Sequence, residues 1–236
     1  MGLLATIISF LHHWIRGRNH VRIIGHGTLN INRNVKLRNS RIYVYPEASL
    51  TIEDGCQLDG VSISIVRGNC TLGQKNILEG ASINIECGSM CVGHHTKIVC
   101  KRIWIRFGGN LNIGHYTNIN NGSEIRCDES VSIGSFNQIS YNVRIWDTNT
   151  HTILSPEDRR KITVEKFPYF GYEKSRPKTA PVAIGDDCWI GEQAAIMKGS
   201  IVGDECIVGF GTLVVGKTLP PRSRAVNEIK LKISTL

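Results

Sequence analysis

A period of six residues runs from Pro181 to Leu219, and it restricts the fold more than any other feature of the chain. Counted in sixes from Ile184, the first position is always aliphatic and the fifth is always small. A period of six fits neither an α-helix nor a single alternating strand. It predicts short strands joined by tight turns, repeated as a solenoid around a narrow aliphatic core. The first positions are Ile184, Ile190, Ile196, Val202, Val208 and Val214, and the fifth are Cys188, Ala194, Ser200, Cys206, Thr212 and Thr218.

A looser form of the same pattern begins at Thr28. Eight segments align so that an aliphatic residue stands at the fourth place and another follows six positions later. Such a repeat predicts stacked coils, in which each strand pairs with the strands of the coils on either side. The fourth residues are Ile31, Ile52, Leu72, Val92, Ile113, Ile133, Ile184 and Val202.

One step in this alignment is too long. Ile133 and Ile184 are 51 positions apart, whereas the other steps lie between 18 and 21. One coil accounts for roughly 20 of these residues, so roughly 30 must leave the solenoid. We place them at 147–180, a run with three prolines, many charges and no hexapeptide. Long loops on rigid scaffolds usually carry function.

The ends of the chain differ from the repeats. Residues 1–16 are apolar at helical spacing, so we expect an amphipathic helix, too short to span a bilayer. It either caps the open end of the solenoid or contacts a membrane surface or a lipid-linked substrate. The expected division is therefore a cap at 1–27, a solenoid at 28–226 with the loop at 147–180, and a tail at 227–236.

Three motifs together resemble a known family. The first two are the hexapeptide block and the histidine in the loop before it, and the third is the pair of short sequences W-I-G at 189–191 and T-L-P-P at 218–221. The chain resembles the hexapeptide-repeat, acyl-CoA-dependent O-acetyltransferases, which include sugar and surface-polysaccharide acetyltransferases. This resemblance implies a left-handed parallel β-helix and a homotrimer. It also implies acetyl-CoA as co-substrate, bound in a groove between neighbouring solenoids.

The resemblance also implies the catalytic residues. His151, in WDTNTHT, would be the general base that removes the proton of a sugar hydroxyl, which suits a neutral imidazole near pH 7. Asp147 or Asn149 would orient its ring. Trp189 should point outward from its strand and lie against the thioester.

Residues near the end of the solenoid would contact the cofactor. Small residues on the outer side would let pantetheine approach the backbone, a lysine would lie near the adenine, and arginines would meet the phosphates. These residues are Gly191, Ala195, Gly209 and Gly211, then Lys217, and then Arg222 and Arg224.

Charge and loop composition point to an anionic acceptor. The chain carries a formal charge of +8, which favours phosphates, acidic glycans or membrane surfaces. We expect a carbohydrate that is acidic or lipid-linked, since aromatic rings stack on sugars and arginines pair with carboxylates. Zinc-finger spacing and RNP-like runs are missing, so nucleic acid is not expected. The relevant loop residues are Arg159, Arg160, Arg176, Phe167, Tyr169, Phe170 and Tyr172.

Two other functions compete with acetyl transfer. The solenoid could be a non-catalytic scaffold with an incidental His151, or a zinc lyase like the γ-carbonic anhydrases, with ligands from His94, His95 and His115. Adjacent histidines rarely share one metal in that fold, and the eight cysteines form no metal pattern, so we expect no metal. Cysteines at inward repeat positions indicate a reducing cytoplasm, at the inner membrane face if the N-terminal helix binds lipid.

Overall fold

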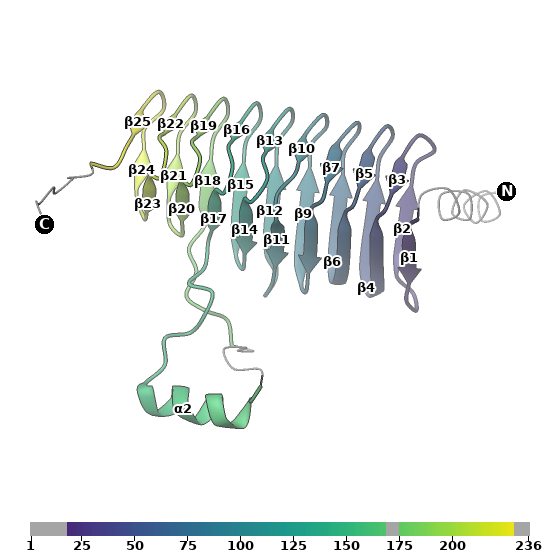
Figure 1. The fold of residues 1–236 in the computed structure, drawn as a ribbon, viewed down its shortest axis with the longest axis horizontal. Coiled ribbons are helices and arrows are strands. Elements are labelled where there is room, and N and C mark those ends of the chain that lie inside the picture. The colour runs from purple at the N-terminus through teal and green to yellow at the C-terminus, as the bar shows by residue number, and fades with distance from the viewer. Residues whose placement is uncertain (1–17, 169–174, 229–236) are drawn as a thin grey trace, which may run out of the picture.

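The computed structural model describes residues 18–168 and 175–228. The helix expected at 1–16 and most of the tail expected at 227–236 lie outside the described residues. The described chain is a stack of parallel strands that runs the length of the molecule (Figure 1). The solenoid predicted from the six-residue period is confirmed.

Each coil contributes one strand to each of three faces. We call them faces A, B and C in the order in which the chain visits them. Faces A and B form one 16-stranded sheet, because β4 and β6 bend around the corner between them, and face C is a separate nine-stranded sheet. Face A contains β1 (His20–Ile23), β4 (Arg41–Ile52), β6 (Ser62–Leu72), β8 (Ser82–Ile85), β11 (Arg102–Ile105), β14 (Glu124–Cys127), β17 (Arg144–Trp146), β20 (Ala195–Met197) and β23 (Leu213–Val215).

The other two faces are built in the same way. Face B contains β2 (Thr28–Ile31), the second halves of β4 and β6, β9 (Gly88–Val92), β12 (Gly109–Ile113), β15 (Ser130–Ile133), β18 (Val182–Ile184), β21 (Ile201–Val202) and β24 (Thr218–Leu219). Face C contains β3 (Lys36–Arg38), β5 (Gln57–Asp59), β7 (Ile77–Glu79), β10 (Lys97–Ile98), β13 (Asn118–Ile119), β16 (Gln138–Ile139), β19 (Trp189–Ile190), β22 (Ile207–Val208) and β25 (Arg224–Ala225).

The strand register follows the alignment of the repeats. Every consecutive pair of fourth residues, from Ile31 with Ile52 to Ile184 with Val202, occupies facing positions in neighbouring strands. The solenoid starts earlier than the expected boundary at Thr28, because β1 pairs in parallel with the first half of β4. Extended backbone there continues the sheet before the hexapeptide pattern begins.

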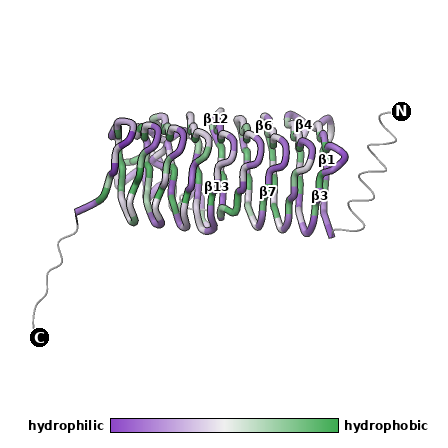
Figure 2. Tube along the Cα trace, turned by 90° about the horizontal axis from the view of Figure 1, so that it is seen from above, coloured by the Kyte–Doolittle hydropathy of each residue, from purple (hydrophilic) through white to green (hydrophobic). Residues whose placement is uncertain are grey.

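Aliphatic side chains fill the interior, and small polar ones hold the coils together. All six first-position residues from Ile184 to Val214 are buried, and Figure 2 shows apolar and polar segments alternating along every coil. At the corner between faces B and C, one side chain per coil donates a hydrogen bond to a backbone carbonyl of the next coil. We call this series the B/C ladder; its donors are Cys56, Asn76, Thr96, Thr117, Asn137, Cys188 and Cys206.

Cys56, Cys188 and Cys206 are buried, as predicted. Their role is broader than that of small apolar residues, because their thiols take the ladder positions that Asn and Thr occupy in other coils. A thiol is a weak donor of the right size for this corner.

The loop leaves the solenoid after β17 and returns before β18, at the corner between faces A and B. Its two arms pair at the base through an antiparallel bridge between Thr148 and Thr179. Beyond the base lies a helix that we did not expect, α2 (Pro156–Glu165), capped by the Ser155 side chain. Figure 1 shows α2 hanging on the side of the solenoid away from β19 and β22. Within the described residues, no helix is long and apolar enough to cross a membrane.

Candidate functional site

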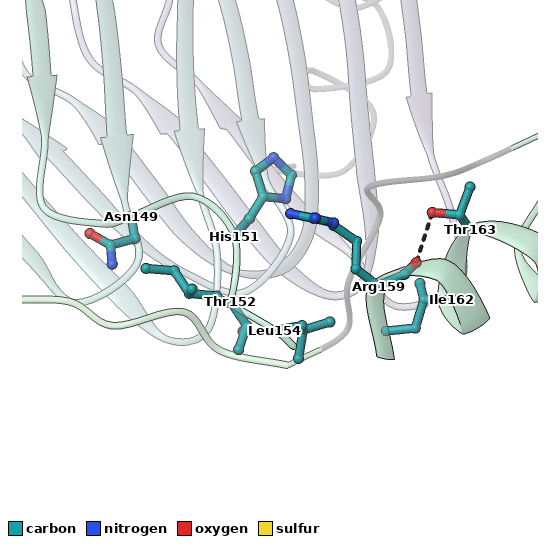
Figure 3. A pocket seen from close by; sticks show the side chains of 8 residues that line it. Asn149, His151, Thr152, Leu154, Arg159, Ile162 and Thr163 are labelled. Carbon is teal, nitrogen blue, oxygen red and sulfur yellow. Dashed lines mark hydrogen bonds between the residues drawn. The ribbon is translucent and has the colours of Figure 1, made fainter. Parts of the chain in front are cut away.

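His151 lines an open cavity of about 480 Å³ in the projecting loop. The ring is exposed to solvent. In Figure 3 the His151 ring and the Arg159 side chain point toward one another across this cavity. The cavity therefore offers one imidazole, one cation and a partly apolar wall to a ligand. Its lining consists of Asn149, His151, Thr152, Ile153, Leu154, Arg159, Ile162 and Thr163.

Helix α2 brings Arg159 to this position. Ser155 caps the helix by accepting a hydrogen bond from the Asp158 N–H at 3.1 Å, and its carbonyl accepts from the Arg159 N–H at 3.0 Å. Thr163 Oγ1 donates to the Arg159 carbonyl at 2.8 Å (dashed in Figure 3). The sequence identified Arg159 only as one basic loop residue among several, because an unexpected helix determines where its side chain points.

The loop aromatics are described only in part. Phe167 is exposed. Tyr169, Phe170 and Tyr172 lie outside the described residues.

Asp147 is buried and serves the backbone. Its Oδ1 accepts from the Asp128 N–H at 2.8 Å, and its Oδ2 accepts from the N–H groups of Glu129 and Ser130 at 2.7 and 2.8 Å. Burial raises the pKa of Asp147, while the three N–H donors act in the opposite direction. Both oxygens are engaged in the turn after β14, so the structure does not support the expectation that Asp147 orients the His151 ring.

Asn149 shares the cavity with His151. Its backbone N–H donates to the Lys178 carbonyl at 3.0 Å, which fixes it to the returning arm of the loop. Of the two residues expected to orient the imidazole, Asn149 alone lines the cavity.

Trp189 points outward from face C, as expected, with 59% of its surface exposed. It stands between Gln138 and Ile207 in the register of the sheet. The loop with His151 starts at the corner between faces A and B, which lies across the triangular coil from face C. Within one chain, His151 and Trp189 are therefore on opposite sides of the solenoid (Figure 1).

The residues expected to bind the cofactor fall into two groups. Gly191, Gly209 and Gly211 lie at the end of face C or at its corner with face A, and Ala195 begins β20 on face A just past that corner. Arg224 extends the outward row of Trp189 and Ile207 on face C. The glycines and Arg224 thus lie along face C or its edge, as Trp189 does, and Ala195 lies next to them on face A.

The remaining two cofactor candidates lie elsewhere. Lys217 is exposed at the corner between faces A and B, near the base of the loop. Arg222 lies at the corner between faces B and C, where its guanidinium binds both carboxylate oxygens of Glu205 at 3.0 Å. These hydrogen bonds raise the pKa of Arg222. To bind a phosphate of the cofactor, Arg222 would have to give up its exposed ion pair with Glu205.

The histidines considered for zinc form a stack at the corner between faces B and C. The rings of His94 and His115 are 4.0 Å apart, and His115 Nδ1 accepts from the His94 backbone N–H at 3.0 Å. Desolvation and the neighbouring His115 and His95 lower the pKa of His94. Among residues 18–168 and 175–228, no three His, Cys, Asp or Glu side chains are grouped to hold a metal ion.

The later coils of the solenoid are similar in sequence to known proteins. Residues 181–216 match the family model for the bacterial transferase hexapeptide with six repeats. Galactoside O-acetyltransferase of Escherichia coli strain K12 is 29% identical over 119 residues, which are 50% of this chain and 51% of that protein. The chain thus matches about half the length of this relative.

A solved structure supports the fold. The polySia-specific acetyltransferase NeuO superposes with a TM-score of 0.56 and 19% identity, over 89% of this chain and 82% of that one. The family match and this likeness confirm the resemblance to hexapeptide-repeat transferases and the β-helix of hexapeptide repeats that it implied.

Proposed function

We propose that this hexapeptide-repeat chain transfers an acetyl group from acetyl-CoA to a hydroxyl of a carbohydrate, with His151 as the general base. The observation that carries the proposal is the exposed imidazole in an open cavity on a loop that the solenoid holds at its base. The two similar proteins are named as acetyltransferases, one of a galactoside and one specific for polySia. Their names favour acetyl transfer to a sugar over the scaffold and zinc-lyase alternatives.

The chemistry needs a base and no covalent intermediate. A neutral ring nitrogen of His151 accepts the hydroxyl proton while the sugar oxygen attacks the thioester carbonyl. The tetrahedral intermediate then expels the CoA sulfur, which takes the proton back from the imidazolium. A nucleophilic cysteine is unnecessary, and six of the eight thiols are buried.

A complete site requires two copies of the chain. His151 and Trp189 lie on opposite sides of the solenoid, so the loop of one protomer must reach face C of another if both residues act on one acetyl group. We therefore propose a homotrimer with three equivalent sites between subunits, in which each interface joins two different surfaces. Exposed apolar residues on the last coils favour such packing; they are Trp189, Ile201, Ile207, Phe210, Leu213 and Val215.

Arg159 indicates which carbohydrate the loop accepts. A guanidinium that faces the catalytic imidazole can bind a carboxylate of the acceptor while the hydroxyl lies against His151. The net charge of +8 would attract such an anion. We propose an acidic glycan or its lipid-linked precursor as acceptor. Contact with the inner membrane face through residues 1–16 stays a prediction.

Release of CoA thiol tests the function. Purified protein is incubated with acetyl-CoA and a panel of neutral and acidic glycans, and thiol release is followed beside product mass. His151→Ala should lower turnover by about 10²- to 10⁴-fold, the usual contribution of a general base, with the KM for acetyl-CoA nearly unchanged. His26→Ala removes an exposed histidine outside the cavity and is the matched control. Turnover of His151→Ala within about threefold of the parent would refute the assignment.

Mixed oligomers test the shared site. His151→Ala and Trp189→Ala protomers should each be poorly active alone. After unfolding and refolding together, about a quarter of the sites would combine an intact His151 from one protomer with an intact Trp189 from its neighbour. Activity should recover to that level. Absence of recovery in mixed trimers, or a fully active monomer by light scattering, would rule out a site between subunits.

A further inference from the structure

Thr150, the residue directly before His151, is held at all three of its polar groups. Its N–H donates to Thr148 Oγ1 at 3.0 Å, its hydroxyl oxygen accepts from Arg126 Nη1 at 3.1 Å, and its carbonyl accepts from Arg106 Nη2 at 3.3 Å. Its φ of +72° lies in the left-handed region, which β-branched residues rarely adopt. The surrounding contacts therefore keep Thr150 in a conformation that it would not favour alone.

Arg106 is itself fixed inside the protein. Its Nε and Nη2 donate to the two carboxylate oxygens of Asp128 at 2.9 and 2.7 Å, and both side chains are almost completely buried. The guanidinium also lies over the Trp104 ring, 4.3 Å from its centre. A bidentate pair of this kind leaves the guanidinium little freedom to turn, so the donor to the Thr150 carbonyl has a defined place.

Arg126 holds the side chain of Thr150 from the next coil. Its Nε donates to Glu124 Oε1 at 2.9 Å, and its guanidinium lies 4.1 Å from the centre of the Trp146 ring. Burial alone would raise the pKa of Glu124, but hydrogen bonds from Arg126 and Arg102 outweigh it and hold that pKa below its usual value. Glu124 therefore stays ionised and keeps Arg126 in place.

The start of the loop is tied to the same turn. Asp147 accepts from the Asp128 backbone N–H, while the Asp128 side chain binds Arg106. Between the end of β17 and His151, the loop is therefore held at two residues. Asp147 is bound to the turn that follows β14, and Thr150 is bound to Arg106 and Arg126. Asp147 contributes to this framework without facing the imidazole.

We propose that Arg106 and Arg126 act through Thr150 to position His151 for proton transfer. The inference rests on the proposed role of His151 as general base. Displacement of a catalytic group by about 1 Å can cost about 100-fold in rate, and an exposed loop needs an anchor to avoid it. Buried ion pairs seldom stabilise a protein more than apolar residues of similar size, so the Arg106–Asp128 pair fits a positioning role better than a purely stabilising one.

Arg126→Met and Arg102→Met form a matched pair for the test. Both arginines bind Glu124 and lie over the Trp104 ring, but of the two only Arg126 has a hydrogen bond to Thr150 among the contacts of the described chain. We expect Arg126→Met to lower kcat by about 10- to 100-fold with the KM for acetyl-CoA within about twofold. Arg102→Met should change neither appreciably, because Glu124 keeps its hydrogen bond from Arg126 and Arg126 keeps its hydrogen bond to Thr150.

Thr150 provides the conservative rescue. Thr150→Val removes the acceptor and keeps the branched shape, so it should lower kcat like Arg126→Met, and Thr150→Ser should recover most of that loss. Because Arg106→Met alone would leave Asp128 buried and unpaired, the Arg106→Met/Asp128→Leu double variant tests that pair without an uncompensated charge. It should fold and lose kcat in the same way.

Hydrogen–deuterium exchange gives a readout that is independent of activity. Exchange at residues 149–152 should become faster in Arg126→Met and Thr150→Val, and stay as in the parent in Arg102→Met. Equal kcat losses in Arg126→Met and Arg102→Met, or unchanged exchange with unchanged kcat in Arg126→Met, would overturn the positioning role. A fully active His151→Ala variant would instead refute the proposed function itself, and this inference with it.

Discussion

Replacement of Arg159 by glutamine tests whether the cavity selects an acidic acceptor. The change removes the guanidinium that points toward His151 and leaves a shorter, neutral polar side chain. A hydrogen bond to a charged group contributes about 1.5–3 kcal/mol. Since about 1.4 kcal/mol corresponds to a factor of ten, kcat/KM for an acidic glycan should fall by about 10- to 140-fold. Arg159 is exposed, so solvent screening favours the lower end of this range.

The assay compares two acceptors and two variants. An acidic glycan and its carboxyl-reduced counterpart are acetylated under conditions in which acetyl-CoA is saturating. Arg160→Gln is the control, because Arg160 carries the same charge on the same helix and does not line the cavity. Arg159→Gln should affect the acidic glycan alone and should leave the KM for acetyl-CoA unchanged.

Two results would contradict this reasoning. If Arg159→Gln and Arg160→Gln lose the same activity, the loop acts only through its overall charge. If the reduced glycan loses as much as the acidic one, Arg159 does not bind a carboxylate.

Three further predictions follow from the fold. Removal of residues 155–176 with a short glycine linker keeps the Thr148–Thr179 bridge, so CoA binding and assembly should persist in calorimetry and light scattering while acceptor turnover collapses; normal turnover would show that the loop is dispensable. Asn137→Ala leaves the partly buried carbonyl of Gly185 and the buried N–H of Cys188 unpaired at about 1–3 kcal/mol each. Urea unfolding should therefore show a loss of about 2–6 kcal/mol, toward the lower end because water reaches the carbonyl, and an unchanged midpoint would refute the importance of the ladder. Burial raises the pKa of Cys70 and Cys100 to about 12, so mass spectrometry after treatment of the native protein with a thiol reagent should find label on Cys87 and Cys91 and not on the buried thiols.

The coil register could be predicted because a stacked solenoid repeats one local rule. A residue such as Ile113 faces inward for the same reason as Ile133, and the step between them equals one coil. Even the position of the loop was readable, since Ile133 and Ile184 had to pair across it. In most folds the separation of two residues in the sequence does not predict whether they are in contact. In a solenoid it does, because residues one coil apart in the sequence lie in neighbouring strands.

Helix α2 was missed although its start carries a signal. Ser155 and Pro156 followed by Glu157 and Asp158 are typical of a capped helix N-terminus. The helix buries none of its residues, so it lacks the apolar periodicity on which we relied. Its consequence, the placement of Arg159 opposite His151, was therefore not predictable from the repeat.

The contacts that hold Thr150 and Asp147 could not be predicted from the sequence either. Asp147 is one of the two residues, with Asn149, that we expected to orient the His151 ring, yet its carboxylate accepts from the backbone N–H of Asp128. The contact from Arg106 to Thr150 joins residues 44 positions apart. Arg106 and Thr150 are buried but stand outside the aliphatic positions of the repeat, for which the six-residue period makes no prediction. Only the three-dimensional stacking of the coils brings them together.

The B/C ladder crosses the loop without interruption, and this has a consequence for how such a protein can change. Asn137 binds the carbonyl of Gly185 and the N–H of Cys188 as though the intervening chain were absent, although these partners are 48 and 51 residues away. The coils above and below the insertion therefore recognise each other regardless of what is threaded between them. Doubling the length of a flexible loop costs only about 0.6 kcal/mol in closure entropy. The loop can therefore vary in length and sequence while the column of coils stays the same. Under the proposed function, a change of acceptor needs a new insert and no change in the coils.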